Sequence, residues 1–180
     1  GKLVRDRFHT HKEITYKESS SLVTDVDRLV ERNIRHELAK EFPEIGFLGE
    51  ELGSIGKNTG LRWIVDPVDG TRNYVANVPH FAISVALAND QDILIGVTYD
   101  PMRDEMFHAV KGHGAFLNYS PIAISNRWSM PESILGVDIG AMDNKALEAF
   151  KLIEFLWPGL QSVRILGSAT LGLAYVAAGR

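Results

Sequence analysis

Acidic side chains occupy five positions in the first half of the chain where they could hold a cation. These positions are Asp27, Glu50, Glu51, Asp66 and Asp69. Two carboxylates held close together repel each other unless a cation lies between them or one of them is protonated. Mg²⁺ prefers oxygen ligands in octahedral geometry and keeps several of its waters. The acidic positions therefore raise the hypothesis of a magnesium site.

The strongest of these signals is the pair Asp66 and Asp69, because turn residues accompany it. Asp66 follows a short apolar run, and Pro67 comes next. Proline forces a turn that can bring the Asp69 carboxylate back toward Asp66. The same turn would expose the Val68 carbonyl as a third oxygen ligand. This segment predicts two carboxylates and one carbonyl around a single cation.

The two residues after this pair suit a phosphate group. Gly70 lets the backbone approach a ligand closely, and Thr71 is expected to open a short helix through Val75. The first N–H groups of a helix have no intrahelical partner and attract anions. A divalent cation beside a phosphate site makes phosphoester hydrolysis the expected chemistry.

Each of these features also has a purely structural explanation, which the residues alone leave open. An Asp before Gly-Thr often caps a helix, and Asp, Pro and Gly are ordinary turn residues. Glu50 and Glu51 follow Gly49 and fit a solvated strand end, while Asp27 fits a helix cap. Taken alone, the residues support a magnesium and phosphate site as one hypothesis among these.

Three elements must position the carboxylates. Apolar residues at helical spacing predict a helix from Thr24 to Phe42, and Thr24 with Asp27 resembles a capping box. A short strand is expected at 45–48, just before Glu50. The apolar run 63–65 predicts a buried strand that ends at the following proline or continues through a bulge.

The middle of the chain predicts an antiparallel meander. Apolar residues alternate with small or polar residues over 81–87 and 93–99, and a third run covers 105–110. Residues 52–60, by contrast, are rich in Gly, Ser and Asn and predict a loop.

Beyond about residue 120 the pattern changes. We expect a helix over 143–156, a strand over 163–166 and an apolar helix over 168–179. The expected buried side of the first helix comprises Ala146, Leu147, Phe150, Ile153 and Phe155. These features predict an N-terminal α+β metal- and phosphate-binding domain at 1–125, followed at 126–180 by the start of a C-terminal α/β domain. Nothing follows the last apolar helix, so we expect this domain to be incomplete.

Composition restricts the class of protein. The 180 residues are 45% hydrophobic and 23% charged, with a net charge of −4, so no nucleic acid partner is expected. The absence of cysteine excludes disulfides and thiolate zinc sites. No apolar run reaches the roughly 20 residues of a membrane span. A cytoplasmic protein without membrane contact is the expectation.

Four segments resemble the inositol monophosphatase family, and they occur in the family's order. Residues 63–74, followed by Pro79 and Phe81, resemble the signature sequence of the family. The other segments are Leu22-Val23-Thr24-Asp25-Val26-Asp27, Gly49-Glu50-Glu51, and Arg164 to Ala169 followed by Val176-Ala177-Ala178-Gly179.

The resemblance implies a fold and an activity. The expected fold is α+β, a layered α-β-α-β-α sandwich, with the first α+β part nearly complete and the second part truncated after Arg180. The expected activity is magnesium-dependent, lithium-sensitive hydrolysis of a phosphomonoester, most simply myo-inositol monophosphate. The expected partners are this small-molecule substrate and, as in many family members, a second copy of the chain in a homodimer.

The resemblance also implies two or three Mg²⁺ ions and their ligands. Glu50, Asp66 and the Val68 carbonyl would hold the first ion, and Asp66 and Asp69 would share the second. Lys17 would help to position a third ion or the phosphate.

Catalytic and substrate-binding roles follow from the same resemblance. Glu50 and the Thr71 hydroxyl would orient the attacking water, and Asp27 would assist Thr71. The residues implied in phosphate or substrate binding are Asp69, Gly70, Thr71, Ala169 and Lys17.

The chain departs from the family's pattern in one important respect. It lacks the later "WDxAAG" motif, which supplies a further Asp to the second metal site. We therefore expect these 180 residues alone to bind the second ion weakly and to turn over slowly or not at all. Two alternatives stay open: the same chemistry on fructose 1,6-bisphosphate or histidinol phosphate, and a protein of this fold that acts by binding a macromolecule.

Overall fold

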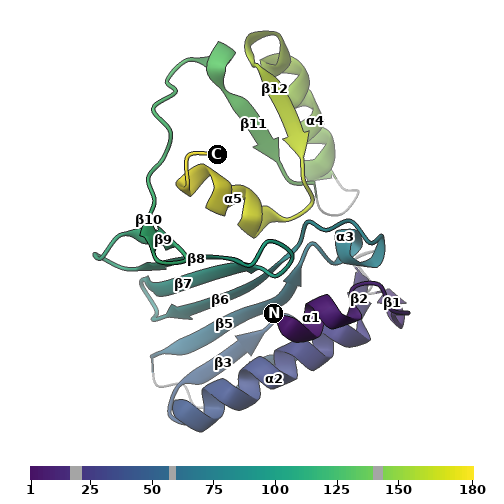
Figure 1. The fold of residues 1–180 in the computed structure, drawn as a ribbon, viewed down its shortest axis with the longest axis vertical. Coiled ribbons are helices and arrows are strands. Elements are labelled where there is room, and N and C mark those ends of the chain that lie inside the picture. Colours follow the sequence, from purple (N-terminus) through teal and green to yellow (C-terminus); the bar gives the residue numbers. More distant parts are fainter. Residues whose placement is uncertain (17–21, 57–59, 140–143) are drawn as a thin grey trace.

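The computed structural model describes residues 1–16, 22–56, 60–139 and 144–180 (Figure 1). Helices and sheets alternate in layers along its long axis. Helices α1 (Lys2–Arg7) and α2 (Asp25–Glu41) cover one face of the large sheet, and α5 (Ala169–Ala177) covers part of the other. Beyond α5 lie a two-stranded sheet and helix α4 (Asn144–Leu156). The predicted α-β-α-β-α layering is confirmed.

The large sheet has eight strands in the order β10-β9-β8-β7-β6-β5-β3-β4. Neighbours from β5 to β10 are antiparallel, which confirms the predicted meander, whereas β3 runs parallel to β5. The strands are β3 (Gly46–Gly49), β4 (Gly53–Ile55), β5 (Arg62–Asp69), β6 (Ala82–Ala88), β7 (Ile93–Asp100), β8 (Glu105–Val110), β9 (Ala115–Leu117) and β10 (Ser120–Pro121). Strand β4 lies inside the segment that was predicted to be only a loop.

Strand β5 continues across Pro67 instead of ending there. Asp66 pairs with Ser84 and Asp69 pairs with Ala82, so the register with β6 shifts between the two acids. A residue without an N–H is tolerated inside a sheet at such a bulge. The bulge was one of the two predicted outcomes, and it turns this end of β5 out of the regular ladder.

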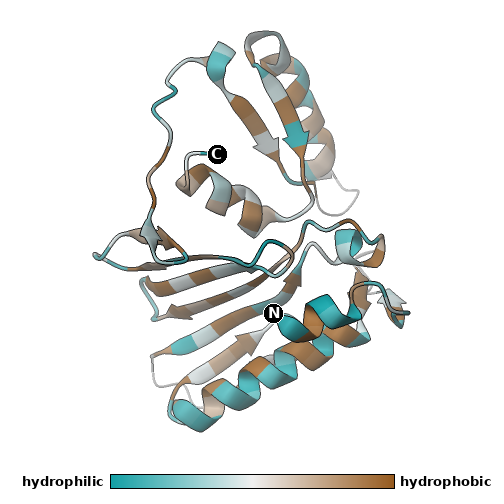
Figure 2. Cartoon of the chain, viewed as in Figure 1, coloured by the Kyte–Doolittle hydropathy of each residue, from teal (hydrophilic) through white to brown (hydrophobic). Residues whose placement is uncertain are grey.

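Helix α2 begins as predicted. The Thr24 hydroxyl accepts hydrogen bonds from the backbone N–H groups of Val26 and Asp27, and the Asp27 side chain accepts from the Thr24 backbone N–H. This is a complete capping box. Val26 and Val30 face the sheet within a core that contains residues of α1 and of the short helix α3 (Thr71–Val75), while hydrophilic residues line the outer side (Figure 2).

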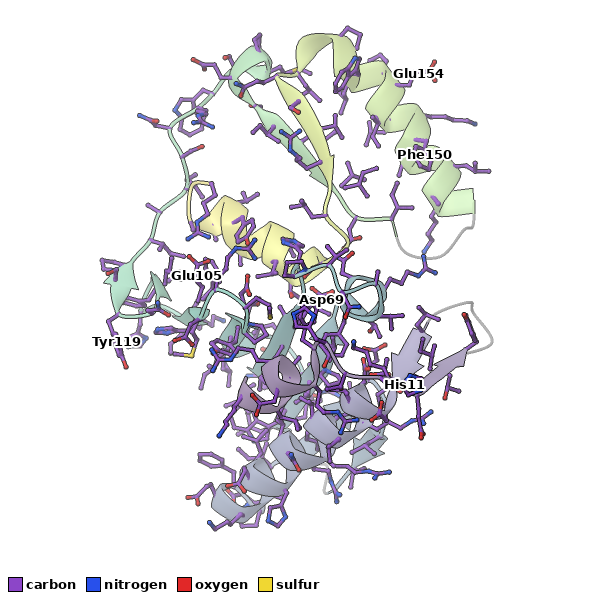
Figure 3. All side chains as sticks on the ribbon, turned by 45° about the vertical axis from the view of Figure 1, so that its right-hand side comes forward. His11, Asp69, Glu105, Tyr119, Phe150 and Glu154 are labelled. Carbon is purple, nitrogen blue, oxygen red and sulfur yellow. The ribbon has the colours of Figure 1, made fainter. Side chains whose placement is uncertain are left out.

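A second, smaller core lies on the opposite face of the sheet. Ala82 and Phe107 from the sheet pack against Leu171 and Ala174 of α5. The two cores fix the sheet between helices on both faces. They also place the start of α5 beside the bulged end of β5, as Figure 3 shows for Asp69.

The last part of the chain contains β11 (Ile134–Val137), which pairs in parallel with β12 (Ser162–Ile165). Strand β11 was not predicted, nor was the hairpin of β1 (Ile14–Tyr16) and β2 (Leu22–Thr24). Short 3₁₀ turns occur at Met130–Glu132 and Trp157–Gly159. The domain boundary near residue 125 stays a prediction.

The buried side predicted for α4 is wrong for three of its five residues. Ala146 is buried, but Leu147, Phe150 and Phe155 are exposed to 59%, 49% and 80%. The apolar spacing identified the helix correctly, yet it cannot say which side another element covers. Among the described residues, no helix has the length and apolar character of a bilayer-spanning segment.

Candidate metal and phosphate site

A cavity of about 610 Å³ lies where the two parts of the chain meet, within the range typical of small-molecule sites. Strands β3 and β5 are parallel, so Glu50, which follows β3, and Asp69, which ends β5, reach the same edge of the sheet. Helix α3 (Thr71–Val75) begins there. The opposite wall comprises Asp138, Ile139, Ile165, Leu166, Gly167 and Ala169.

Three carboxylates crowd at the sheet side of this cavity. Burial, the charges of Glu50 and Asp69, and a hydrogen bond with Glu50 raise the pKa of Asp66 to about 8. The Asp66 carboxylate also accepts a hydrogen bond from the Val68 N–H at 3.1 Å. Without a cation, one proton is therefore held among these acids near neutral pH.

The type and crowding of these ligands fit a hard divalent cation. Carboxylates and a carbonyl are the oxygen ligands that Mg²⁺ takes, and a cation would relieve the repulsion at Asp66. Within the described residues, no three His, Asp or Glu side chains already stand at metal-ligand spacing.

The Thr71 hydroxyl lies between two acceptors. It is 3.2 Å from Asp27 Oδ1 and 3.0 Å from the Val68 carbonyl oxygen. A hydroxyl has one proton to donate, so it satisfies one acceptor at a time. Asp27 is buried and is fixed by its capping box, which makes it a rigid support for Thr71.

One oxygen of Asp69 receives all three of the hydrogen bonds that described residues donate to this side chain. Asp69 Oδ2 lies 2.6 Å from the Ser168 hydroxyl, 2.8 Å from the Thr170 N–H and 2.6 Å from the Thr170 hydroxyl. Ser168 precedes α5, but its hydroxyl does not cap that helix. The start of α5 thus holds the Asp69 side chain in one orientation.

Gly70 and Asn73 join the two walls. Gly70 has a φ of 95°, and a Cβ there would lie 2.9 Å from the Gly167 carbonyl oxygen, so a side chain would be strained and crowded. Asn73 Nδ2 donates to the carbonyl oxygens of His80, at 2.7 Å, and Leu166, at 2.8 Å. These contacts fix the start of α3 against the loop that leads into α5.

Glu31 fixes the turn that carries Glu50. Its buried carboxylate accepts hydrogen bonds from the N–H groups of Glu51, at 3.1 Å, and Leu52, at 2.9 Å. A Cβ on Gly49 would lie 1.8 Å from Glu31 Oε1, so only glycine fits there. Burial first, and then the charges of the neighbouring Glu51 and Glu50, raise the pKa of Glu31.

The structure brings most of the predicted site residues together. Asp27, Glu50, Asp66, Val68, Asp69, Gly70 and Thr71 are adjacent, and Ala169 lines the same cavity. Lys17 lies outside the described residues. Their catalytic and ligand roles stay predictions.

Five residues at or behind the site were not predicted from the sequence to belong to it: Glu31, Asn73, Asp138, Ser168 and Thr170. For Glu31 a signal existed, because it follows Asp27 by four residues and so lies on the same side of α2. Asp138, Ser168 and Thr170 reach the site only through the packing of distant segments.

Taken together, the layered α+β fold and the acidic site beside a Gly-Thr turn match the arrangement that the sequence resemblance implied. The sequence profile described as "Inositol monophosphatase family" matches residues 1–180. The chain belongs to the inositol monophosphatase family.

Several curated relatives share more than a third of their aligned residues with the chain. Inositol monophosphatase 1 of Solanum lycopersicum is 37% identical, with 100% of this chain and 68% of the relative aligned. Inositol-1-monophosphatase of Rhizobium meliloti is 40% identical, over 93% of this chain and 64% of the relative. Nus factor SuhB of Haemophilus influenzae is 37% identical, over 93% of this chain and 64% of the relative. The chain thus spans about two thirds of the length of these relatives.

Solved structures confirm the fold. The extragenic suppressor protein SuhB of Bartonella henselae superposes with a TM-score of 0.92 at 36% identity, covering 99% of this chain and 69% of that one. The IMPase of Thermotoga maritima gives a TM-score of 0.90 at 33% identity, covering 99% and 68%.

Proposed function

We propose that this protein hydrolyses a small phosphomonoester, with myo-inositol monophosphate as the first candidate substrate. The observation that carries the proposal is the crowding of Asp66 by Glu50 and Asp69 directly beside the Gly70-Thr71 turn. Membership of the inositol monophosphatase family supports it. Family members are metal-dependent, which fits an oxygen-rich site with excess negative charge.

Two or three Mg²⁺ ions would be held by Glu50, Asp66, Asp69 and the Val68 carbonyl. Bound there, they would acidify a water and offset charge on the attacking and leaving oxygens. The Asp69 side chain, held through Oδ2 by α5, has Oδ1 to offer to an ion or to a substrate hydroxyl. Dense hydrogen bonding at one oxygen fixes the direction of the other.

The remaining residues bind and orient. The backbone N–H groups of Gly70 and Thr71 would bind the phosphate, and the positively charged side chain of Lys17 would help to position it. The Thr71 hydroxyl and Glu50 would orient the attacking water, and the buried Asp27 carboxylate would hold the Thr71 hydroxyl in place. The backbone at Ala169 would contact the rest of the substrate.

A second candidate function is the binding of a macromolecular partner. The observation that favours it is the similarity to relatives named Nus factor SuhB, at 34–37% identity. The two functions are compatible, because the carboxylates and the Gly-Thr turn are present here together with that similarity. Homodimer formation and cytoplasmic localisation remain predictions from the sequence.

Phosphate release from myo-inositol 1-phosphate tests the first proposal. The full natural chain is assayed across a Mg²⁺ titration, with and without Li⁺, beside Asp69→Asn and an exposed control, Asp6→Asn. We expect release that requires Mg²⁺, falls with Li⁺, is abolished by Asp69→Asn and is unchanged by Asp6→Asn. Absence of release, or release that Asp69→Asn leaves intact, would contradict the catalytic proposal and favour macromolecular binding.

A further inference from the structure

The cavity wall opposite the Gly70-Thr71 turn carries a carboxylate that has no role in the proposed metal or phosphate contacts. Asp138 directly follows β11, and the pairing of Val137 with Ile165 places it beside the loop that leads into α5. Asp138 lines the same cavity as Asp69, Gly70 and Thr71. A substrate with its phosphate on the turn would therefore extend toward Asp138.

The charges around the cavity are unequal. Among its described lining residues, three carry carboxylates (Glu50, Asp69 and Asp138) and one, Arg72, carries a guanidinium. Burial first, and then the charge of Asp69, raise the pKa of Asp138, so the two carboxylates are close enough to interact. Cations at Glu50 and Asp69 would offset those two charges. Asp138 lies at the opposite wall and is not among the proposed ligands, so those cations would not offset the charge of its ionised form.

A carboxylate at that wall favours one kind of substrate and opposes another. An ionised carboxylate accepts hydrogen bonds only, and hydroxyl groups of a polyol supply donors for it. A second phosphate in the same place would meet a like charge in a partly desolvated site, which is a common device of specificity. This wall would therefore favour a substrate whose distant end carries hydroxyl groups over one whose distant end carries a second phosphate.

We propose, on the basis of the proposed phosphatase function, that Asp138 selects polyol monophosphates. Its carboxylate accepts a hydrogen bond from a hydroxyl distant from the scissile phosphate and repels a second phosphate. The substrate class is thus a polyol with one phosphate, and sugar bisphosphates are disfavoured. Asp138 is a specificity-determining residue outside the proposed metal ligands.

Two matched pairs of compounds test the two halves of this proposal. Fructose 1-phosphate and fructose 1,6-bisphosphate differ only in the second phosphate, whereas myo-inositol 1-phosphate and cyclohexyl phosphate differ only in the ring hydroxyls. The ratio of kcat/KM within each pair is measured for the full natural chain, Asp138→Asn and the exposed control Asp6→Asn. Equilibrium binding of the same compounds with Mg²⁺ gives a readout that does not depend on turnover.

We expect Asp138→Asn to raise the bisphosphate-to-monophosphate ratio about tenfold and to lower the inositol-to-cyclohexyl ratio several-fold, mainly through KM. Added salt should raise the first ratio in the wild type and leave it nearly unchanged in Asp138→Asn, because salt screens charge repulsion. Asp6→Asn should match the wild type.

The outcomes separate this proposal from the proposed function. If both kcat/KM ratios of Asp138→Asn stay within twofold of the wild-type ratios, the role proposed for Asp138 is wrong, even if phosphate release is robust. Tight binding of monophosphates without hydrolysis contradicts the catalytic proposal, and the binding ratios then decide on Asp138. Binding of neither compound class by the wild type overturns both.

Discussion

Thr170 donates both its backbone N–H and its hydroxyl to the same oxygen of Asp69, at 2.8 and 2.6 Å, across 101 positions of sequence. Asp69 ends the bulged strand β5, and Thr170 lies in the first turn of α5. A carboxylate at the start of a helix meets unpaired N–H groups and the positive end of the helix dipole. The second part of the chain therefore orients a carboxylate that belongs to the first.

We predict that Thr170→Val weakens Mg²⁺ binding, whereas Thr170→Ser, which keeps the hydroxyl, binds Mg²⁺ like the wild type. Valine keeps the shape and the backbone N–H but removes a hydrogen bond to a charged group, worth about 1.5–3 kcal/mol. A freer Asp69 side chain should cost about tenfold in Mg²⁺ affinity, measured by calorimetry. If the Thr170→Val and Thr170→Ser variants bind Mg²⁺ equally well, the Thr170 hydroxyl does not position Asp69.

A second prediction concerns the turn that carries Glu50. Glu31→Gln replaces an acceptor-only group by one that also carries N–H donors, which face the N–H groups of Glu51 and Leu52. We expect a loss of about 1–3 kcal/mol in the free energy of unfolding, measured by urea denaturation.

The control for Glu31 lies on the same helix. Glu37 is exposed on α2, so Glu37→Gln should change the unfolding free energy by less than about 0.5 kcal/mol. Gly49→Ala should destabilise the chain strongly, since its Cβ would overlap Glu31 Oε1. Equal effects of Glu31→Gln and Glu37→Gln would contradict the proposed support of the turn.

The parts of the site that sequence analysis predicted correctly are local. The capping box of Thr24 and Asp27, the helix after Gly70, and the grouping of Asp66 with Asp69 all depend on residues a few positions apart. Turns and helix caps are determined by residues within a few positions of one another, so a sequence pattern can predict them. The bulge at Pro67 was one of two outcomes, since proline excludes a regular central strand but not a bulged one.

The parts that were missed depend on tertiary packing. Ser168 reads as the N-cap of α5, yet its hydroxyl donates to Asp69, because α5 is packed against the sheet beside β5. Helix periodicity predicts that α4 is a helix, but the exposure of Phe150 depends on which elements surround it. Local patterns identify elements and turns, whereas their partners across the cavity require the assembled fold.

A third prediction concerns the contact between the two cavity walls. Asn73→Asp keeps the side-chain shape but replaces the donor that bonds the His80 and Leu166 carbonyls with a carboxylate oxygen. Carboxylate oxygens facing carbonyl oxygens repel, so we expect a loss of about 1–3 kcal/mol in the free energy of unfolding. Hydrogen–deuterium exchange should increase at residues 166–170. The exposed Asn33→Asp serves as the control, and equal exchange in both variants would contradict this role.

The last prediction concerns pH. Because the pKa of Asp66 is raised to about 8 without a cation, the folded chain holds a proton there that the unfolded chain, with a pKa of about 4, has lost. Folding stability of the metal-free protein should therefore fall as pH rises from about 4 to about 8. Mg²⁺ must displace that proton, so its affinity should increase with pH over the same window.

Proton release on metal binding is the direct measurement. Calorimetric titrations of Mg²⁺ at pH 6.5, in two buffers with different ionisation enthalpies, should show release of close to one proton per protein chain in the wild type. Asp66→Asn has no proton to displace and should show little release, together with weaker binding. Release that is the same in Asp66→Asn would mean that another group carries the proton. A wild type that releases none would show that Asp66 is already ionised, and the crowding of Glu50, Asp66 and Asp69 would then not control how the site takes up its metal.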